Sequence, residues 1–159
     1  MHSARHQSAF GAELRQSHLE SIDKINEYLN LLKVEDKYKD FVSAKRIQTC
    51  VEKLKSQNII WAKKEQPFLS YLPYNFIFKN SKIKDKILIQ GVADLIINID
   101  DKIYLIDYKT TKANKPDQLV EKYKLQLYLY AICLEKALNI KLSGTYIYSF
   151  WLNDFVKIN

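Results

Sequence analysis

Two strand patterns and the turn between them fill residues 87–109, which read ILIQGVADLIINIDDKIYLIDYK. β-Branched and other apolar residues dominate Ile87 to Ile99 and Lys102 to Lys109, as is typical of strands in a sheet. The polar pair Asp100 and Asp101 separates them, in the place of a hairpin turn. The stretch therefore predicts an antiparallel hairpin in the core sheet, and the rest of the chain is interpreted around it.

A hairpin closed symmetrically about this turn places Asp94 directly opposite Asp107, and Lys109 follows on the same face. Directly opposed residues on antiparallel strands have Cβ atoms about 4.5–5.5 Å apart, so the two carboxylates would project side by side. Like charges so close repel each other, and a divalent cation relieves that repulsion. We therefore expect Asp94, Asp107 and Lys109 to be catalytic residues, with the two carboxylates holding a metal.

Mg²⁺ suits this donor set, and Mn²⁺ would substitute for it. Mg²⁺ prefers oxygen ligands and keeps several waters, so the backbone carbonyl of Tyr108 is a further expected ligand. Lys109 would orient or deprotonate an attacking water, or stabilise charge developing on a phosphate. These roles predict metal-dependent phosphodiester hydrolysis. The alternative is an exposed hairpin with ordinary surface charges; against it, both aspartates interrupt apolar runs, where charge is costly.

The composition is that of a folded globular protein with an anionic partner. The 159 residues are 47% hydrophobic and 27% charged with only 3 Gly and 3 Pro, which excludes disordered and low-complexity classes. Its 25 basic residues outnumber 18 acidic ones, with lysine clusters at 79–86 and 109–124. Such basic patches favour a polyanionic partner, for example DNA as single strands or duplex ends, although either cluster alone is more typical of a solvated loop.

Other cofactors and compartments are not expected. Two cysteines are too few for an iron–sulfur cluster or a four-cysteine zinc site. No apolar run approaches the 18 or so residues of a membrane span, and no signal peptide opens the chain. We therefore expect no membrane partner and a cytoplasmic location.

The length fits one domain over residues 1–159. A helical N-terminal part is predicted over about 9–56, because apolar residues recur at helical spacing over about 9–32 and again over about 38–56. The catalytic sheet and helix are predicted over about 58–151.

Within that second part, β-branched and aromatic residues follow position 58, with Pro67 and Pro73 interpreted as breakers. A helix is predicted to open at Pro116 or Asp117, and a last strand to cover Leu142 to Phe150.

Several short sequence motifs, in order, resemble those of the PD-(D/E)XK nuclease superfamily. They are Glu65-Gln66-Pro67-Phe68, Gly91-Val92-Ala93-Asp94, Ile106-Asp107-Tyr108-Lys109-Thr110 and Gln126-Leu127-Tyr128-Leu129-Tyr130-Ala131. Within the superfamily they are similar to the C-terminal nuclease domain of AddA/RecB-type helicase–nucleases. The resemblance implies an α/β fold with a restriction-endonuclease-like core, a mixed central sheet flanked by helices. It also implies a DNA-repair or recombination nuclease, exonuclease or endonuclease, working with a helicase domain or partner subunit.

The resemblance implies three further site residues. The family places a histidine ligand four residues after a glycine on its first helix; here Gly11 is followed at that spacing by Arg15, and His18 is the available metal ligand. The alternative for His18 is an inward-facing core residue. Gln126 would contact the site or the DNA backbone, and Tyr130 would help to seat its helix for substrate binding. For both, the alternative is core packing.

Two function classes stay open from the sequence. One is a metal-dependent DNA nuclease, as part of a helicase–nuclease or as a free-standing exonuclease. The other is a catalytically silent nucleic-acid-binding module on the same fold. The retained carboxylates favour the enzyme, because a binding module gains nothing from two acids that face a polyanion.

Overall fold

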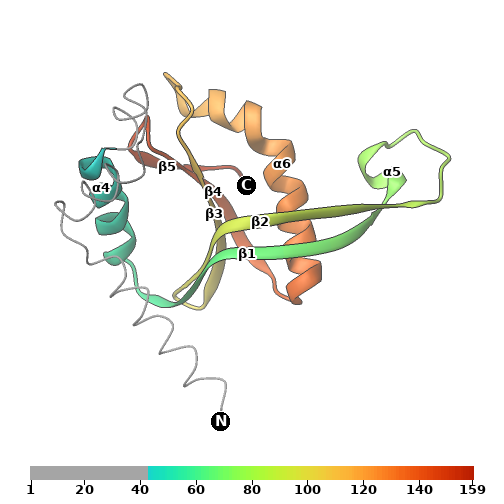
Figure 1. The fold of residues 1–159 in the computed structure, drawn as a ribbon, viewed down its shortest axis with the longest axis horizontal. Coiled ribbons are helices and arrows are strands. Elements are labelled where there is room, and N and C mark those ends of the chain that lie inside the picture. Colours follow the sequence, from blue (N-terminus) through green and yellow to red (C-terminus); the bar gives the residue numbers. More distant parts are fainter. Residues whose placement is uncertain (1–42) are drawn as a thin grey trace, which may run out of the picture.

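A computed structural model describes residues 43–159 of the chain (Figure 1). The helix predicted over about 9–32, with His18 on it, lies outside the described residues. The second predicted helix, over about 38–56, is present as α4 (Ala44–Lys55). None of the helices in the described part is both long and apolar enough to cross a membrane.

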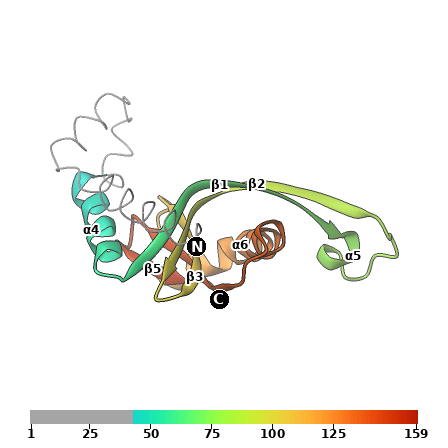
Figure 2. The same cartoon turned by 90° about the horizontal axis from the view of Figure 1, so that it is seen from below.

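The strands form one mixed five-stranded sheet in chain order. Neighbouring strands pair antiparallel except β3 and β4, which are parallel and are joined by the crossover helix α6 (Pro116–Leu138). The helices α4 and α6 pack on opposite faces of the sheet (Figures 1 and 2). This confirms the predicted α/β fold with a mixed sheet flanked by helices. The strands are β1 (Ile59–Pro73), β2 (Lys86–Ile99), β3 (Lys102–Lys109), β4 (Leu142–Ser149) and β5 (Asp154–Lys157).

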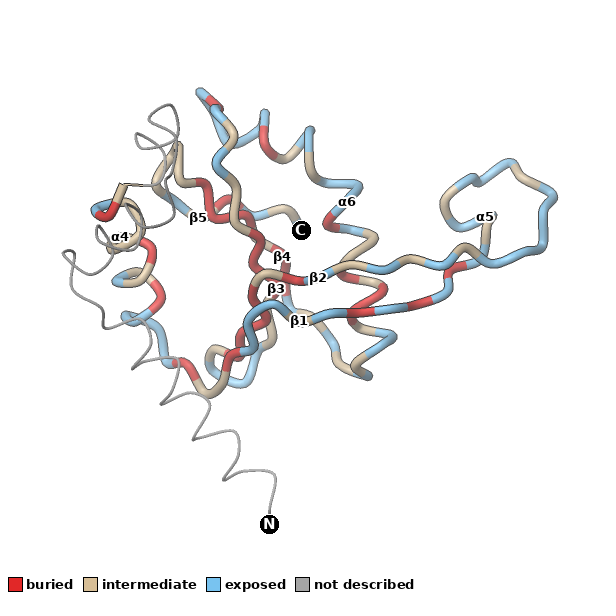
Figure 3. The backbone as a smooth tube through the Cα atoms, in the orientation of Figure 1, coloured by how far each residue is buried: buried red, intermediate tan, exposed pale blue. Residues whose placement is uncertain are grey.

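Alternate residues of β2 and β3 build the two halves of the core. Leu95 and Ile106 pack with α4, whereas their chain neighbours Ile96 and Leu105 pack with α6. Strands covered on both faces have nearly continuous apolar sequences, which explains the strength of the sequence pattern here. Figure 3 shows the buried residues concentrated where these strands lie between the helices.

The turn between β2 and β3 is the one that the sequence predicts. Ile99 pairs with Lys102, and Asp100 and Asp101 reverse the chain with φ angles of 50° and 63°. Two consecutive left-handed residues are typical of the type I′ turn, whose twist matches that of the flanking strands.

Both strands of the outer hairpin β1–β2 exchange faces at one corner, where Glu65 lies opposite Asp94. Glu65 has a left-handed backbone, with φ of 48°, and the ladder with β2 skips it. On β2, Ala93 and Ile96 pack with α6 although they are three residues apart, so strand alternation is broken between them. Asp94 therefore sits at the bend, not in the regular part of the sheet.

Beyond this corner, β1 and β2 continue as a two-stranded arm, residues 66–93, with the short helix α5 (Tyr74–Ile77) at its tip (Figures 1 and 2). The interpretation of Pro67 as a strand breaker is wrong, because Pro67 lies inside β1 and pairs with Val92. β1 is an edge strand, and an edge tolerates the missing N–H of proline.

The arm rests on α6 through a close approach at Gly91. A Cβ atom on Gly91 would lie 2.6 Å from Phe68 Cζ and 3.0 Å from Tyr130 Cζ. The two rings meet edge to face with their centroids 4.9 Å apart, and Phe68 is buried. Only a residue without a side chain leaves room for this contact.

Gly91→Ala is expected to destabilise the fold by about 1–3 kcal/mol, because neither ring can move without losing its own packing. Thermal unfolding followed by circular dichroism measures the loss. Gly144→Ala is the matched control: its Cβ would meet Tyr146 Cε2 at 3.2 Å, a milder contact, and alanine also reduces the entropy of the unfolded chain. Equal melting temperatures for the two variants would contradict the packing at Gly91.

Candidate active site

Asp107 and Lys109 lie on β3, the central strand of the sheet. Asp107 is 6% exposed, because β2 and β4 flank it and α6 covers its face. Lys109 follows two residues later on the same face, and its Nζ lies 2.6 Å from Asp107 Oδ2. The backbone N–H of Phe150 donates to the Lys109 carbonyl at 2.9 Å and holds this end of the strand against β4. A buried carboxylate thus has an ammonium group as its counter-charge.

Asp94 reaches the same place from the corner of β2. The β2–β3 ladder ends at Leu95 and Ile106, one pair before Asp94 and Asp107. The sequence predicts the two aspartates as a directly opposed pair, and the structure does not pair them in the ladder. Instead, the backbone N–H of Tyr108 donates to Asp94 Oδ2 at 2.8 Å. This hydrogen bond fixes the Asp94 carboxylate beside the residue that follows Asp107.

Burial raises the pKa of the Asp107 carboxyl group above its usual range. The Lys109 ammonium works against this shift and lowers the pKa, while the nearby Asp94 carboxylate raises it further. Desolvation is the largest of these effects, so the protein environment disfavours the charged form of Asp107. A cation placed between the two carboxylates would reverse that balance, since opposite charge favours the ionised form.

The two carboxylates provide donors suited to a divalent cation. Asp107 Oδ2 is buried, and within the described part of the chain its counter-charge is the Lys109 ammonium, 2.6 Å away. Across residues 43–159, no group of three acidic, histidine or cysteine side chains converges here or elsewhere. A cation held by Asp94 and Asp107 would therefore complete its shell with backbone oxygen, water or a ligand from outside these residues, and hard oxygen ligands fit Mg²⁺.

Tyr108 contributes to the site through its backbone. Its side chain is half-buried on the α4 face, tilted against Phe150 and edge-on to Tyr148. The expected role of its carbonyl as a metal ligand stays a prediction, as does that of His18, which lies outside the described residues.

The structure adds Tyr123 to the neighbourhood of the site. The Lys109 ammonium lies 4.8 Å from the centroid of the Tyr123 ring, in the geometry of a cation–π contact. The Tyr123 hydroxyl is 2.5 Å from Thr111 Oγ1. The sequence places Tyr123 on the apolar side of α6, but no local signal indicates that this turn of the helix meets the end of β3.

Gln126 and Tyr130 lie one and two turns further along α6. Gln126 is exposed, one helical turn after Tyr123, so its amide is accessible to a ligand at this edge. Tyr130 is half-buried against Phe68 and Gly91, where it seats the helix on the arm. Their predicted contacts with substrate stay predictions.

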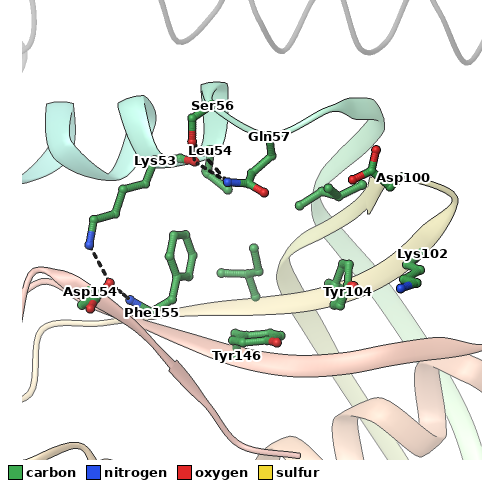
Figure 4. Close-up of a pocket in the computed structure, with 12 residues that line it drawn as sticks. Lys53, Leu54, Ser56, Gln57, Asp100, Lys102, Tyr104, Tyr146, Asp154 and Phe155 are labelled. Atoms are coloured by element: carbon green, nitrogen blue, oxygen red, sulfur yellow. Dashed lines mark hydrogen bonds and ion pairs between the residues drawn. The ribbon is translucent and has the colours of Figure 1, made fainter.

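A separate cavity of about 480 Å³ lies on the opposite face of the sheet, between α4 and the strands (Figure 4). Its polar wall includes Lys53, Asp100 and Asp154, and its aromatic wall includes Tyr104 and Tyr146. None of Asp94, Asp107 and Lys109 lines it. The candidate site instead lies on the α6 face of the sheet, where the bend of β2 at Asp94 meets the C-terminal part of β3.

Curated relatives match about 60% of the chain. An ATP-dependent helicase/nuclease subunit from Ligilactobacillus salivarius (strain UCC118) is 39% identical over 98 residues, covering 60% of this chain and 8% of the relative. Proteins of the same name from Listeria welshimeri serovar 6b and Clostridium perfringens (strain 13 / Type A) are 37% identical over 105 residues and 35% over 101. The chain spans about 8% of the length of these relatives.

The family model described as "PD-(D/E)XK nuclease superfamily" matches residues 5–150, which is most of the chain and includes every residue of the candidate site. That match agrees with the mixed sheet, the paired aspartates at the end of the β2–β3 hairpin and the lysine beside them. The chain belongs to the PD-(D/E)XK nuclease superfamily.

Proposed function

We propose that this chain is a metal-dependent nuclease domain, residues 1–159, that hydrolyses phosphodiester bonds in DNA. The observation that carries the proposal is the convergence of Asp94, Asp107 and Lys109 on the α6 face of the sheet, where the buried Asp107 carboxylate meets the Lys109 ammonium at 2.6 Å. PD-(D/E)XK nucleases generally depend on a divalent metal, which supports the same assignment.

Asp94 and Asp107 would hold Mg²⁺, with Mn²⁺ as a substitute. When bound, the cation supplies a Lewis acid and lowers the pKa of a bound water. The Tyr108 N–H fixes one Asp94 oxygen, and the buried strand β3 fixes Asp107, so both ligands are held before substrate arrives. Such preorganisation lowers the cost of assembling charge at the site.

Lys109 would act on the phosphate or on the attacking water. Its ammonium neutralises Asp107 in the described state, and a cation that takes over that task leaves the ammonium free to face an anionic substrate. The Tyr123 ring beside it limits where the side chain can go. The group then stabilises negative charge on the phosphate, or takes a proton from water if it is deprotonated.

The partner would be DNA, and the chain would work with a helicase. The formal net charge of +7 and the lysines at 109–124 favour a polyanion near the site. Because the curated relatives are named as helicase/nuclease subunits and are much longer than this chain, we infer a nuclease part of a DNA-repair or recombination helicase–nuclease, working in the cytoplasm.

Asp107→Ala and Asp94→Ala are each expected to abolish cleavage while DNA binding persists or rises, since a negative charge that faces the phosphates has gone. Calorimetry measures metal binding, and single-turnover assays measure cleavage. Excess chelator should abolish cleavage by the unsubstituted chain. Glu121→Ala, an exposed carboxylate on α6, is the control that keeps activity. Full activity in chelator, or in both aspartate variants, would overturn the metal site, whereas DNA binding by the parent without cleavage in any divalent metal would favour the silent binding module.

Lys109→Ala is expected to keep metal binding but to slow single-turnover cleavage by a factor of about 10² or more, the scale of a lost charge-stabilising donor or base. Lys55→Ala, an exposed lysine of α4, removes the same charge without the contact to Asp107. If both lysine variants slow the reaction equally, the effect of Lys109 is general electrostatics and the assigned role fails.

Gln126→Ala is expected to lower turnover with little change in melting temperature, because an exposed amide contributes positioning and not packing. Leu127→Ala, its fully buried neighbour, should instead destabilise the fold by about 2–5 kcal/mol. Thermal melts and specific activity of the two variants separate the roles; a lower melting temperature with unchanged specific activity for Gln126→Ala would favour packing.

A further inference from the structure

The tip of the arm meets α6 through two exposed aromatic rings. The rings of Phe76, in α5, and Tyr128, in α6, are parallel to within 7° with centroids 6.1 Å apart. Phe76 is 39% exposed and Tyr128 47%. Near them, Phe78 stacks on Tyr74 and is itself 51% exposed. Exposed aromatic side chains that cluster in this way mark interaction sites.

The same tip carries the first lysine cluster. The loop after α5 is closed by the Tyr74 N–H, which donates to the Asp85 carbonyl at 2.8 Å. Lys79, Lys82, Lys84 and Lys86 are all exposed there, with Asp85 as the acidic residue among them. Within the described part of the chain none of the four forms an ion pair. The tip therefore combines unneutralised positive charge with aromatic faces.

This surface is continuous with the candidate site along α6. Figure 2 shows α5 turned to the same side of the arm as α6. Lys124 precedes Tyr128 by one helical turn, and both are exposed on the same face of α6. Tyr123, at the Lys109 ammonium, is half-buried on the neighbouring flank of the helix.

We propose that the arm tip and the adjoining face of α6 bind single-stranded DNA and guide it to the Asp94–Asp107–Lys109 site. Lysines hold the phosphates, and Phe76 and Tyr128 stack on unpaired bases, the combination that binds single strands without sequence preference. Within a duplex, only the terminal base pair has a free face to offer these rings. This proposal rests on the proposed function, because it takes the Asp94–Asp107–Lys109 site to be the nuclease site that the guided strand reaches.

The span sets the length of strand required. Eight residues of β2 separate Asp94 from Lys86, which is about 26 Å at the rise of a strand. At the phosphate spacing of a stacked strand this distance corresponds to about eight nucleotides. Shorter strands cannot reach from the site to Lys86, and longer strands engage both the site and the lysines of the tip.

The test measures binding of a series of fluorescent oligothymidylates, from about 4 to about 20 nucleotides, to the full chain in excess chelator. For the parent, affinity should rise steeply beyond about eight nucleotides. The double variant Phe76→Ala/Tyr128→Ala should lose that rise and bind the longest strand at least about tenfold more weakly. Lys82→Ala/Lys84→Ala should lower the slope of log affinity against log salt by about 1.4.

Lys55→Ala/Lys157→Ala removes two exposed lysines away from the arm and should leave both quantities unchanged. Circular dichroism melts check that the exposed substitutions leave the fold intact. Parental affinity of the arm variants for long strands would overturn the proposal, as would equal losses on duplex DNA. So would a self-association of the chain that Phe76→Ala/Tyr128→Ala abolishes, because the rings would then be a protein contact.

Cleavage with Mg²⁺ is assayed separately and keeps the two proposals distinguishable. Arm variants that cut but bind long strands as the parent does would refute the guide alone. A chain that never cuts with any divalent metal, yet loses single-strand affinity when the arm is changed, would refute the nuclease assignment and support the arm as a single-strand binding surface.

Discussion

The ion pair between the buried Asp107 carboxylate and the Lys109 ammonium is the constraint around which the structure is organised. An acid at 6% exposure needs a counter-charge, and the strand provides one two residues later on the same face. Asp107 is buried this deeply because β3 is the central strand and because the crossover helix α6 covers its face. The site is therefore part of the core and not an addition to its surface.

The sequence predicted those helices and strands that local side-chain periodicity and turn residues determine without long-range contacts. The β2–β3 hairpin, the helix that opens at Pro116 and the strand at Leu142 follow from alternation, apolar spacing and the aspartate pair of the turn. These are local properties, readable within a window of a few residues. The hairpin pattern also predicted that Asp94, Asp107 and Lys109 lie together in one site, although the ladder ends one pair before the aspartates.

Other features depend on contacts between distant segments and could not be predicted this way. The left-handed Glu65 reverses which face of β1 meets α6, and nothing about a glutamate suggests that conformation. Pro67 is tolerated because β1 lies at an edge, a fact of topology. Tyr123 reaches Lys109 only because α6 crosses back over the end of β3, and the short strand β5 is stable only against β4.

The parallel pairing of β3 with β4 has a consequence for how the protein is made. The other described strand pairs close over shorter connections, whereas β4 joins β3 only after residues 110–141 have formed the crossover. Closing the longest connection is entropically the hardest step and is expected late in folding. Until it happens, Asp107 is open to water on one side, and the environment that tunes its charge does not exist. A chain emerging from the ribosome would thus carry Asp94, Asp107 and Lys109 before β4 completes the surroundings of Asp107.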